Sequence, residues 1–192
     1  YDGHGNITSK TGMGSYTYAS GTHRVISTAQ YGGDAWSNTG HCNATSSANY
    51  CYDEAGNMTA DDTGRTLNYT AYDKPYRIEA GSGHVTEFLY GPNRARYVRQ
   101  DTNPAGELQT TFYVGNVEKI VYESGDYTIR RYIAGVGMIV QDYNQYDSAL
   151  ESEDLRFFYK DHLGSLSVIT GADGQVVEQM SFDSFGKRRH HE

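Results

Sequence analysis

An eight-residue motif that occurs twice constrains the fold more than any other feature of the chain. Tyr1-Asp2-Gly3-His4-Gly5-Asn6-Ile7-Thr8 returns as Tyr52-Asp53-Glu54-Ala55-Gly56-Asn57-Met58-Thr59, with Tyr, Asp, Gly, Asn, an apolar residue and Thr at the same positions. Weaker copies begin at Tyr72-Asp73, Tyr90-Gly91 and Phe182-Asp183, and Tyr113, Tyr132 and Tyr159 fill the interval. The Tyr-centred unit therefore recurs roughly every 20 residues, a period typical of repeat architectures, and has room for two short strands and two turns.

The chemistry of one copy predicts a strand–turn–strand corner. In a strand that ends at Tyr52, the rings of Tyr50 and Tyr52 lie on one face, as do those of Tyr16 and Tyr18. Asp53 can accept hydrogen bonds from backbone N–H groups of the following turn, and Gly56 or Asn57 can adopt the left-handed conformation. Met58 and Thr59 then restart an extended segment. The motif is thus explained by architecture.

Alternating patterns between the corners predict further strands. Residues 85–90 alternate, and residues 166–170 alternate before the turn signal Gly171-Ala172-Asp173-Gly174, so that residues 176–180 form the second arm of a hairpin. The 18 Tyr and 22 Gly against 3 Pro also favour turn-dense β structure. We expect an all-β fold, a repetitive strip that forms part of a curved or spiral β-shell.

Two segments interrupt the pattern. Residues 31–49 form a polar loop that carries Trp36, and the acidic stretch 148–155 is expected to be a loop or one helical turn. The predicted organisation is a repeat strip over 1–156 and a different, truncated C-terminal segment over 157–192, continuous with the same sheet.

The charge and the polar residues exclude several classes of function. A net charge of −8 repels nucleic acid, and no stretch has the roughly 20 apolar residues of a membrane span. Cys42 and Cys51 can form a disulfide in an oxidising compartment or stay as two thiols, and the scattered His residues predict neither a metal site nor a cofactor. The acidic residues lack calcium-loop spacing, so they are interpreted as surface charge. Asn-x-Thr sequons at Asn6, Asn43, Asn57 and Asn68 indicate exposed turns more than glycosylation.

The residues resemble one family. The doubled Tyr-Asp-x-x-Gly-Asn-apolar-Thr motif is similar to YD repeats. The stretch from Phe158-Tyr159-Lys160-Asp161-His162-Leu163-Gly164-Ser165 to Phe182-Asp183-Ser184-Phe185-Gly186 resembles the Rhs-associated core. The chain thus resembles Rhs proteins, relatives of Tc-toxin cocoon subunits and of the teneurin YD shell. The matching structural residues are Tyr1, Asp2, Gly5, Asn6, Tyr52, Asp53, Gly56, Asn57, Tyr72, Asp73, Asp161, His162, Leu163, Gly164, Ser165, Phe182, Asp183 and Gly186.

The resemblance implies a shell that encapsulates and helps to deliver a C-terminal toxin or effector, in a secreted or cell-surface protein. Its implied partners are the rest of its own shell, the toxin cargo and components of a secretion system. In that family the core is followed by a self-cleaving segment and the effector, and we expect neither of these in residues 1–192. The alternative is an adhesion module whose Tyr rows stack on surface glycans.

Asp161, His162 and Ser165 could indicate nucleophilic catalysis. Adjacent residues of an extended chain project to opposite faces, so Asp161 cannot easily orient His162 as a catalytic triad requires. We expect both side chains to bond to backbone at a corner, and we expect no enzyme activity.

Overall fold

The computed structural model describes residues 1–11, 14–28, 50–61, 63–182, 186 and 188–189. These residues form strands and turns and no helix, which confirms the predicted all-β class. The predicted loop at 31–49, with Trp36, lies outside the described residues. The strands are β1 (Ser9–Lys10), β2 (Gly14–Tyr18), β3 (Val25–Thr28), β4 (Tyr50–Tyr52), β5 (Met58–Asp61), β6 (Thr66–Tyr69), β7 (Pro75–Glu79), β8 (Val85–Tyr90), β9 (Arg96–Thr102), β10 (Leu108–Val114), β11 (Val117–Val121), β12 (Tyr127–Ile133), β13 (Gly137–Tyr143), β14 (Leu150–Lys160), β15 (Leu166–Thr170) and β16 (Val176–Gln179).

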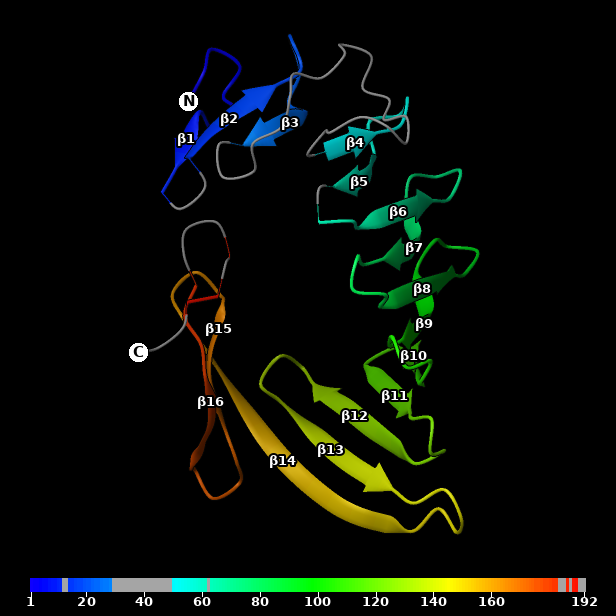
Figure 1. The fold of residues 1–192 in the computed structure, drawn as a ribbon. Coiled ribbons are helices and arrows are strands. Elements are labelled where there is room, and N and C mark those ends of the chain that lie inside the picture. The colour runs from blue at the N-terminus through cyan, green and yellow to red at the C-terminus, as the bar shows by residue number, and fades with distance from the viewer. Residues whose placement is uncertain (12–13, 29–49, 62, 183–185, 187, 190–192) are drawn as a thin grey trace. The chain divides into compact units, whose positions relative to one another are not determined.

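The strands are joined in chain order. β1, β2 and β3 form a three-stranded sheet, and β4 to β16 form a 13-stranded sheet in which each strand neighbours the next in sequence (Figure 1). The pairs from β4 to β8 and from β10 to β16 are antiparallel hairpins. Short connections suffice for such a meander because antiparallel neighbours need only a tight turn.

The chain divides into two compact units, residues 1–89 with 100–107 and residues 90–99 with 108–192. The predicted boundary between residues 156 and 157 lies within strand β14 and stays a prediction.

The strands lengthen from β4 to β9. Strand length rises from three residues in β4 through four, five and six to seven in β9. The first residues of successive turns, Asp53, Asp61, Thr70, Ala80, Gly91 and Asn103, are accordingly 8, 9, 10, 11 and 12 residues apart. A unit of two strands and two turns thus spans 17 residues at first and 23 residues later, a range that includes the predicted 20. Because the length of the unit changes, the later copies of the motif are harder to recognise in the sequence.

Three of the strand predictions are confirmed in detail. β4 contains Tyr50 and Tyr52, β8 covers residues 85–90, and β15 pairs with β16 across the turn at Gly171 to Gly174. In β2 the rings of Tyr16 and Tyr18 share a face, with centroids 6.4 Å apart.

The expectation for residues 148–155 is wrong from Leu150 onward. These residues begin β14, an 11-residue strand in which Leu150 pairs with Tyr143 and Leu155 with Ile139. The acidic side chains of Glu151 and Glu153 stay exposed in this strand. The weak local preference is overridden because β13 and β15 both pair with the segment.

The apolar core is thin. The buried apolar side chains are Cys51, Val98, Ile120, Val140 and Ile169, at 5–8% exposure. No large side chain of the described residues falls below 2% exposure. Single sheets bury little on either face, so the polar bonds of the turns become important in holding register.

Candidate functional site

Ten of the described turns share one geometry, which we call the corner. A corner spans five residues. The N–H of the first donates to the carbonyl of the fifth, and the N–H of the fourth donates to the carbonyl of the first, at 2.9 and 3.1 Å in Asp53–Asn57. This is the three-residue hairpin connection, a type I turn followed by a left-handed residue. In the described chain, corners of this form begin at Asp2, Asp53, Asp61, Thr70, Ala80, Gly91, Asn103, Tyr122, Asp161 and Gly171.

The fourth residue of the corner has positive φ. It is Gly in most corners, for example Gly5 at +82° and Gly56 at +92°, because glycine has no Cβ to clash in this conformation. Asp73 (+61°) and Arg94 (+59°) take the same position without being glycine. Of the two candidates in the second motif, Gly56 and not Asn57 is therefore the left-handed residue.

Where the first residue of the corner is Asp or Asn, its side chain accepts hydrogen bonds from backbone N–H groups of the turn. Oδ1 of Asp2 accepts from the N–H of His4 and of Asn6, both at 2.9 Å. Oδ1 of Asp161 accepts from Leu163 at 2.8 Å and from Ser165 at 2.9 Å. Asn103 does the same through its amide oxygen. The side chain satisfies turn N–H groups that the hairpin leaves without partners, which is the role proposed from the sequence.

The fifth residue completes the carboxylate shell. Nδ2 of Asn6 donates to Oδ2 of Asp2 at 2.9 Å, and Nδ2 of Asn57 donates to Oδ2 of Asp53 at 3.0 Å. These side-chain bonds are the main cause that lowers the pKa of Asp2 and of Asp53. These bonds favour the ionised carboxylate, so the hydrogen bonds of the corner are strongest when the Asp is charged.

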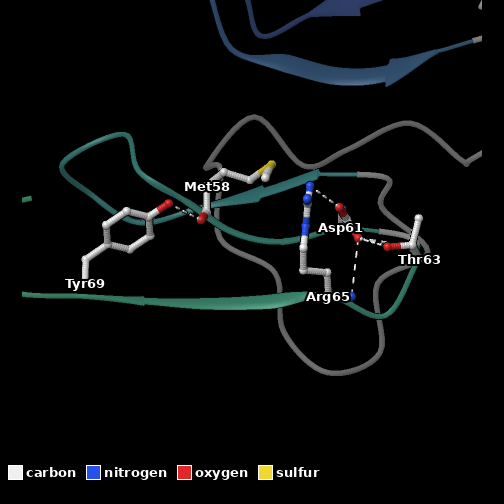
Figure 2. A network of polar contacts seen from close by, with 5 residues as sticks. All are labelled: Met58, Asp61, Thr63, Arg65 and Tyr69. Carbon is white, nitrogen blue, oxygen red and sulfur yellow. Dashed lines mark hydrogen bonds and ion pairs between the residues drawn. The ribbon is translucent and has the colours of Figure 1, made fainter. Parts of the chain in front are cut away.

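Asp61 shows the same shell with different donors, and Figure 2 shows it from close by. Its carboxylate is 5% exposed, lies 2.6 Å from the Arg65 guanidinium and accepts from the Thr63 hydroxyl at 2.5 Å. Burial opposes ionisation, but the Thr63 hydrogen bonds and the Arg65 charge outweigh it and lower the pKa of Asp61.

The Asn residues also join one corner to the next. Nδ2 of Asn6 donates to the Thr22 carbonyl at 3.1 Å, and its Oδ1 lies 2.5 Å from Nδ1 of His23. Nδ2 of Asn57 donates to Oδ1 of Asp73, in the corner 16 residues further on, at 3.0 Å. Each motif Asn is therefore bonded within its own corner and to a neighbouring turn, which for Asn6 is the longer turn at residues 19–24.

The tyrosine hydroxyls join neighbouring strands. The hydroxyl of Tyr69 donates to the Met58 carbonyl at 2.9 Å, 11 residues back (Figure 2). The hydroxyl of Tyr18 donates to the Ile7 carbonyl at the same distance and the same separation in sequence. Tyr52 donates in the same way to the Val25 carbonyl, 27 residues back. Burial is the largest cause that raises the pKa of all three tyrosines. The carbonyl always belongs to the residue that follows a turn, so the ring anchors a strand to the preceding corner.

Corners that follow one another along an edge touch. A Cβ on Gly81 would lie 2.3 Å from the Thr63 carbonyl oxygen, which leaves space only for glycine. Oε2 of Glu123 accepts from the Leu108 N–H at 2.9 Å, and Oδ1 of Asp126 accepts from the Gln145 N–H at 3.1 Å. Edge contacts of this kind hold the corners of each unit in rows.

The third predicted copy of the motif is out of register. Tyr72 and Asp73 do not end a strand, because they lie inside the corner that begins at Thr70. The position of the motif Tyr is taken by Tyr69 and that of the Asp by Thr70, whose Oγ1 accepts from the Lys74 N–H at 3.2 Å. Asp73 occupies the glycine position instead.

The stretch Asp161 to Ser165 forms a corner, with Gly164 at φ +86°. Hydrogen bonding from the Ser165 backbone is the main cause that lowers the pKa of Asp161. His162 and Leu163 are exposed, and within the described chain the His162 side chain makes no hydrogen bond, contrary to the expectation that it bonds to backbone. These residues are brought together as a turn and not as a catalytic triad.

The last motif and the cysteines are described in part. Phe182 pairs with Arg188, and Gly186 has φ +82°, while Asp183 lies outside the described residues. The pairing matches that of the other corners, where Tyr52 pairs with Met58 and Lys160 with Leu166. Cys51 is buried at the centre of β4, and Cys42 lies outside the described residues, so the disulfide stays a prediction.

Sequence reasoning missed the corners that begin at Asp61 and Asn103, although Asp61 and Gly64, and Asn103 and Gly106, have the spacing of Asp53 and Gly56. It also missed a polar row across β12, β13 and β14. There the buried Thr128 donates to Oδ1 of Asp142 at 2.6 Å, and Ser152 donates to Oδ2 at 2.7 Å. These bonds lower the pKa of Asp142.

The described residues contain no group of three His, Cys, Asp or Glu side chains arranged to hold a metal ion. Among the same residues we find no helix that is both long and apolar enough to cross a membrane.

Comparisons with protein-family profiles and with curated protein sequences find no match. Solved structures do match. The chain superposes on the Tc holotoxin pore of Photorhabdus luminescens with a TM-score of 0.60 at 15% identity, on TcdB2-TccC3 with 0.56 at 16%, and on TcdB2-TccC3-Cdc42 with 0.58 at 15%. In each case the match covers 71% of this chain and 7% of the other. The chain thus has the β-strip fold found in these toxin chains and spans a small part of their length.

Proposed function

We propose that the chain is a segment of an Rhs-type YD-repeat shell, whose role is to form wall around a C-terminal toxin or effector. One observation carries the proposal. The strands β4 to β16 are joined in chain order into one sheet, most of them by the same repeated corner, and the chain is similar in fold to the TcdB2-TccC3 chains.

The exposed faces of the strip support a wall more than a self-contained globular domain. In β10 the alternating side chains of Phe112 and Val114 are 41% and 73% exposed, and Phe157 of β14 is 39% exposed. A sheet of a globular domain normally buries its apolar face against a second layer. Apolar side chains left exposed on a single sheet suit a wall that contacts other parts of a larger assembly.

The proposal assigns the chain no catalytic group and no cofactor. Its partners are the remainder of its own shell and the enclosed cargo, with secretion components acting on the assembled protein. Secretion or display at the cell surface follows from the delivery of a toxin. The Asp161-to-Gly186 stretch is assigned to the core that closes the shell.

Protease protection of the cargo tests this function. The complete polypeptide that carries this chain is treated with a protease, and the lifetime of its C-terminal region is compared with that of the same region expressed alone. We expect the carried region to survive much longer. In the matched variant Gly164→Val, which strains the corner at Asp161, we expect that protection to be reduced. Equal lifetimes in the intact and the isolated forms would contradict encapsulation.

One groove favours the second candidate, adhesion to glycans. A cavity of about 710 Å³ is lined by Tyr90, Tyr97 and Tyr113, with the Arg96 guanidinium 4.8 Å from the Tyr113 ring centroid. Tyrosine rings can stack on the apolar faces of sugars. A glycan array probed with the purified chain and with Tyr97→Ala tests this function. Binding that the substitution removes would support adhesion, and an empty array would exclude it.

A further inference from the structure

The three described Asn-x-Thr sequons have different surroundings, although their sequences are equivalent. Asn6 and Asn57 are the fifth residues of corners, and Asn68 lies in β6, two residues before the corner at Thr70. The sequon at Asn43 lies outside the described residues. Transfer of a glycan requires the side-chain nitrogen of Asn, so the bonds made by each nitrogen decide which site can carry one in the folded chain.

The side-chain nitrogens of Asn6 and Asn57 are fully used. Nδ2 of Asn6 donates to the Asp2 carboxylate and to the Thr22 carbonyl, and the residue is 6% exposed. Nδ2 of Asn57 donates to the carboxylates of Asp53 and Asp73. A primary amide has two hydrogens, and both are engaged in each case. A glycan would replace one of them and leave a carboxylate or a carbonyl without its donor.

Asn68 has none of these bonds. Its side chain is exposed, and it makes no hydrogen bond within the part of the chain that the structure describes. Successive side chains of a strand point to opposite faces, so Asn68 lies on the face opposite Tyr69, whose hydroxyl anchors β6 to Met58. It shares its face with the paired residue Arg77, which is engaged with Glu87 and Glu79. A substituent on Asn68 therefore extends into solvent and breaks no bond of the corner.

We propose that Asn68 is an N-glycan acceptor site and that the corner sequons at Asn6 and Asn57 are closed to modification by the fold. The donor is a lipid diphosphate-linked oligosaccharide. The Asn68 Nδ2 forms a bond to C1 of the first sugar, the bond from C1 to the phosphate oxygen breaks, the nitrogen loses one proton, and the lipid diphosphate leaves. The inference is independent of the shell function, because it concerns only the surroundings of three side-chain amides.

Secretion of the chain from a eukaryotic host that holds this donor tests the proposal. Glycopeptide mapping is applied to the secreted, protease-resistant protein. We expect a glycan at Asn68 and unmodified peptides at Asn6 and Asn57. Asn68→Gln removes the acceptor without touching a corner bond, and we expect this variant to be secreted and folded with no glycan at the described sequons.

Two further variants test the sequon at Asn57 by itself. Thr8→Val, Thr45→Val and Asn68→Gln together leave only the sequon at Asn57, and Thr59→Val in the same background removes that sequon while keeping the Asn57 side chain. We expect both proteins to yield an unmodified folded fraction, with any Asn57-glycosylated chains retained in the host or digested rapidly. A protease-resistant protein with a glycan on Asn57, or a folded wild-type chain whose Asn68 is never modified, would overturn the inference.

Discussion

At the scale of single residues, the motif is a set of interlocking hydrogen bonds. The Asp serves the backbone of its own turn, the Gly supplies the left-handed conformation, and the Asn joins the Asp to a neighbouring corner. The Tyr completes the set by anchoring the next strand to the preceding corner. Each residue type is needed for a different bond, which is why the motif Tyr, Asp, Gly and Asn occur together.

The left-handed position predicts a clear difference between two glycines of one corner. Gly5 has φ +82° and Gly3 does not have positive φ, and an added Cβ would meet nothing within 4 Å at either position. Backbone strain therefore separates them. We expect Gly5→Ala to cost about 1–2 kcal/mol and Gly3→Ala to be neutral or to stabilise by up to about 1 kcal/mol. Urea unfolding of both variants checks this, and equal effects would contradict it.

The corner carboxylates predict acid sensitivity. The pKa values of Asp2, Asp53, Asp61 and Asp161 are lowered from 3.8 in the folded chain. A lowered pKa means that the folded state favours the ionised form. The stabilisation is therefore complete well above pH 3.8 and is lost as the pH falls below this value toward the folded pKa.

Asp53→Asn isolates one of these groups. The amide oxygen can still accept from the turn, as that of Asn103 does, but it does not titrate. We expect the variant to be less stable than wild type at neutral pH and to lose less of its stability on acidification. The free energy of unfolding measured by urea titration at several pH values checks this, and parallel pH profiles would show that Asp53 does not contribute.

At the scale of strands, we expect the connection between two strands to accept inserted sequence. Tyr52 reaches the Val25 carbonyl 27 residues back, whereas Tyr69 makes the same bond to Met58 over 11 residues. The difference of 16 residues equals the difference in length between segment 29–49, with 21 residues, and segment 62–66, with five. Val25 and Thr28 then correspond to Met58 and Asp61.

Replacement of residues 29–49 by the sequence of residues 62–66, Asp-Thr-Gly-Arg-Thr, tests this correspondence. We expect the shortened chain to fold with the Tyr52 bond in place and to gain about 1 kcal/mol from the shorter loop. Hydrogen exchange of β4 and β5 under reducing conditions is the measurement. The same insert with valine in place of its glycine is the control, and we expect it to lose the gain. Loss of protection in both proteins would show that the segment is required for the fold.

At the scale of the whole molecule, a strip has end strands that a closed sheet lacks. β16 is the last strand of the 13-stranded sheet, and its Val177 is 52% exposed. An exposed end strand is a template for pairing with another chain, so we expect concentration-dependent self-association. Sedimentation velocity at increasing concentration measures it.

Two substitutions separate the end strand from the faces of the sheet. Val177→Lys places a charge on the end strand, and Val114→Lys places one on β10, a strand inside the sheet whose Val114 is 73% exposed. We expect the first to reduce association and the second to leave it unchanged. The reverse result would show association through the face, and a strict monomer at high concentration would contradict the prediction.

The sequence by itself was sufficient to predict the corners at Asp53 and Asp161. The bonds of a corner join residues within five positions of one another, so the roles of Asp53 and Asp161 could be predicted from local chemistry, while the choice between Gly56 and Asn57 stayed open. The alternation of residues 85–90 and 166–170 was sufficient for the same reason. The β-strip class followed from their repetition.

Only the tertiary structure decided the register and width of the strip. Tyr72-Asp73 matches the start of the motif but does not begin a corner, because the corner there begins at Thr70. Residues 150–155 form a strand because they pair with β13. The Asn57–Asp73 and Tyr52–Val25 bonds join residues 16 and 27 apart. Such choices depend on which neighbouring strand is present and how long it is, and a local pattern contains no information about either.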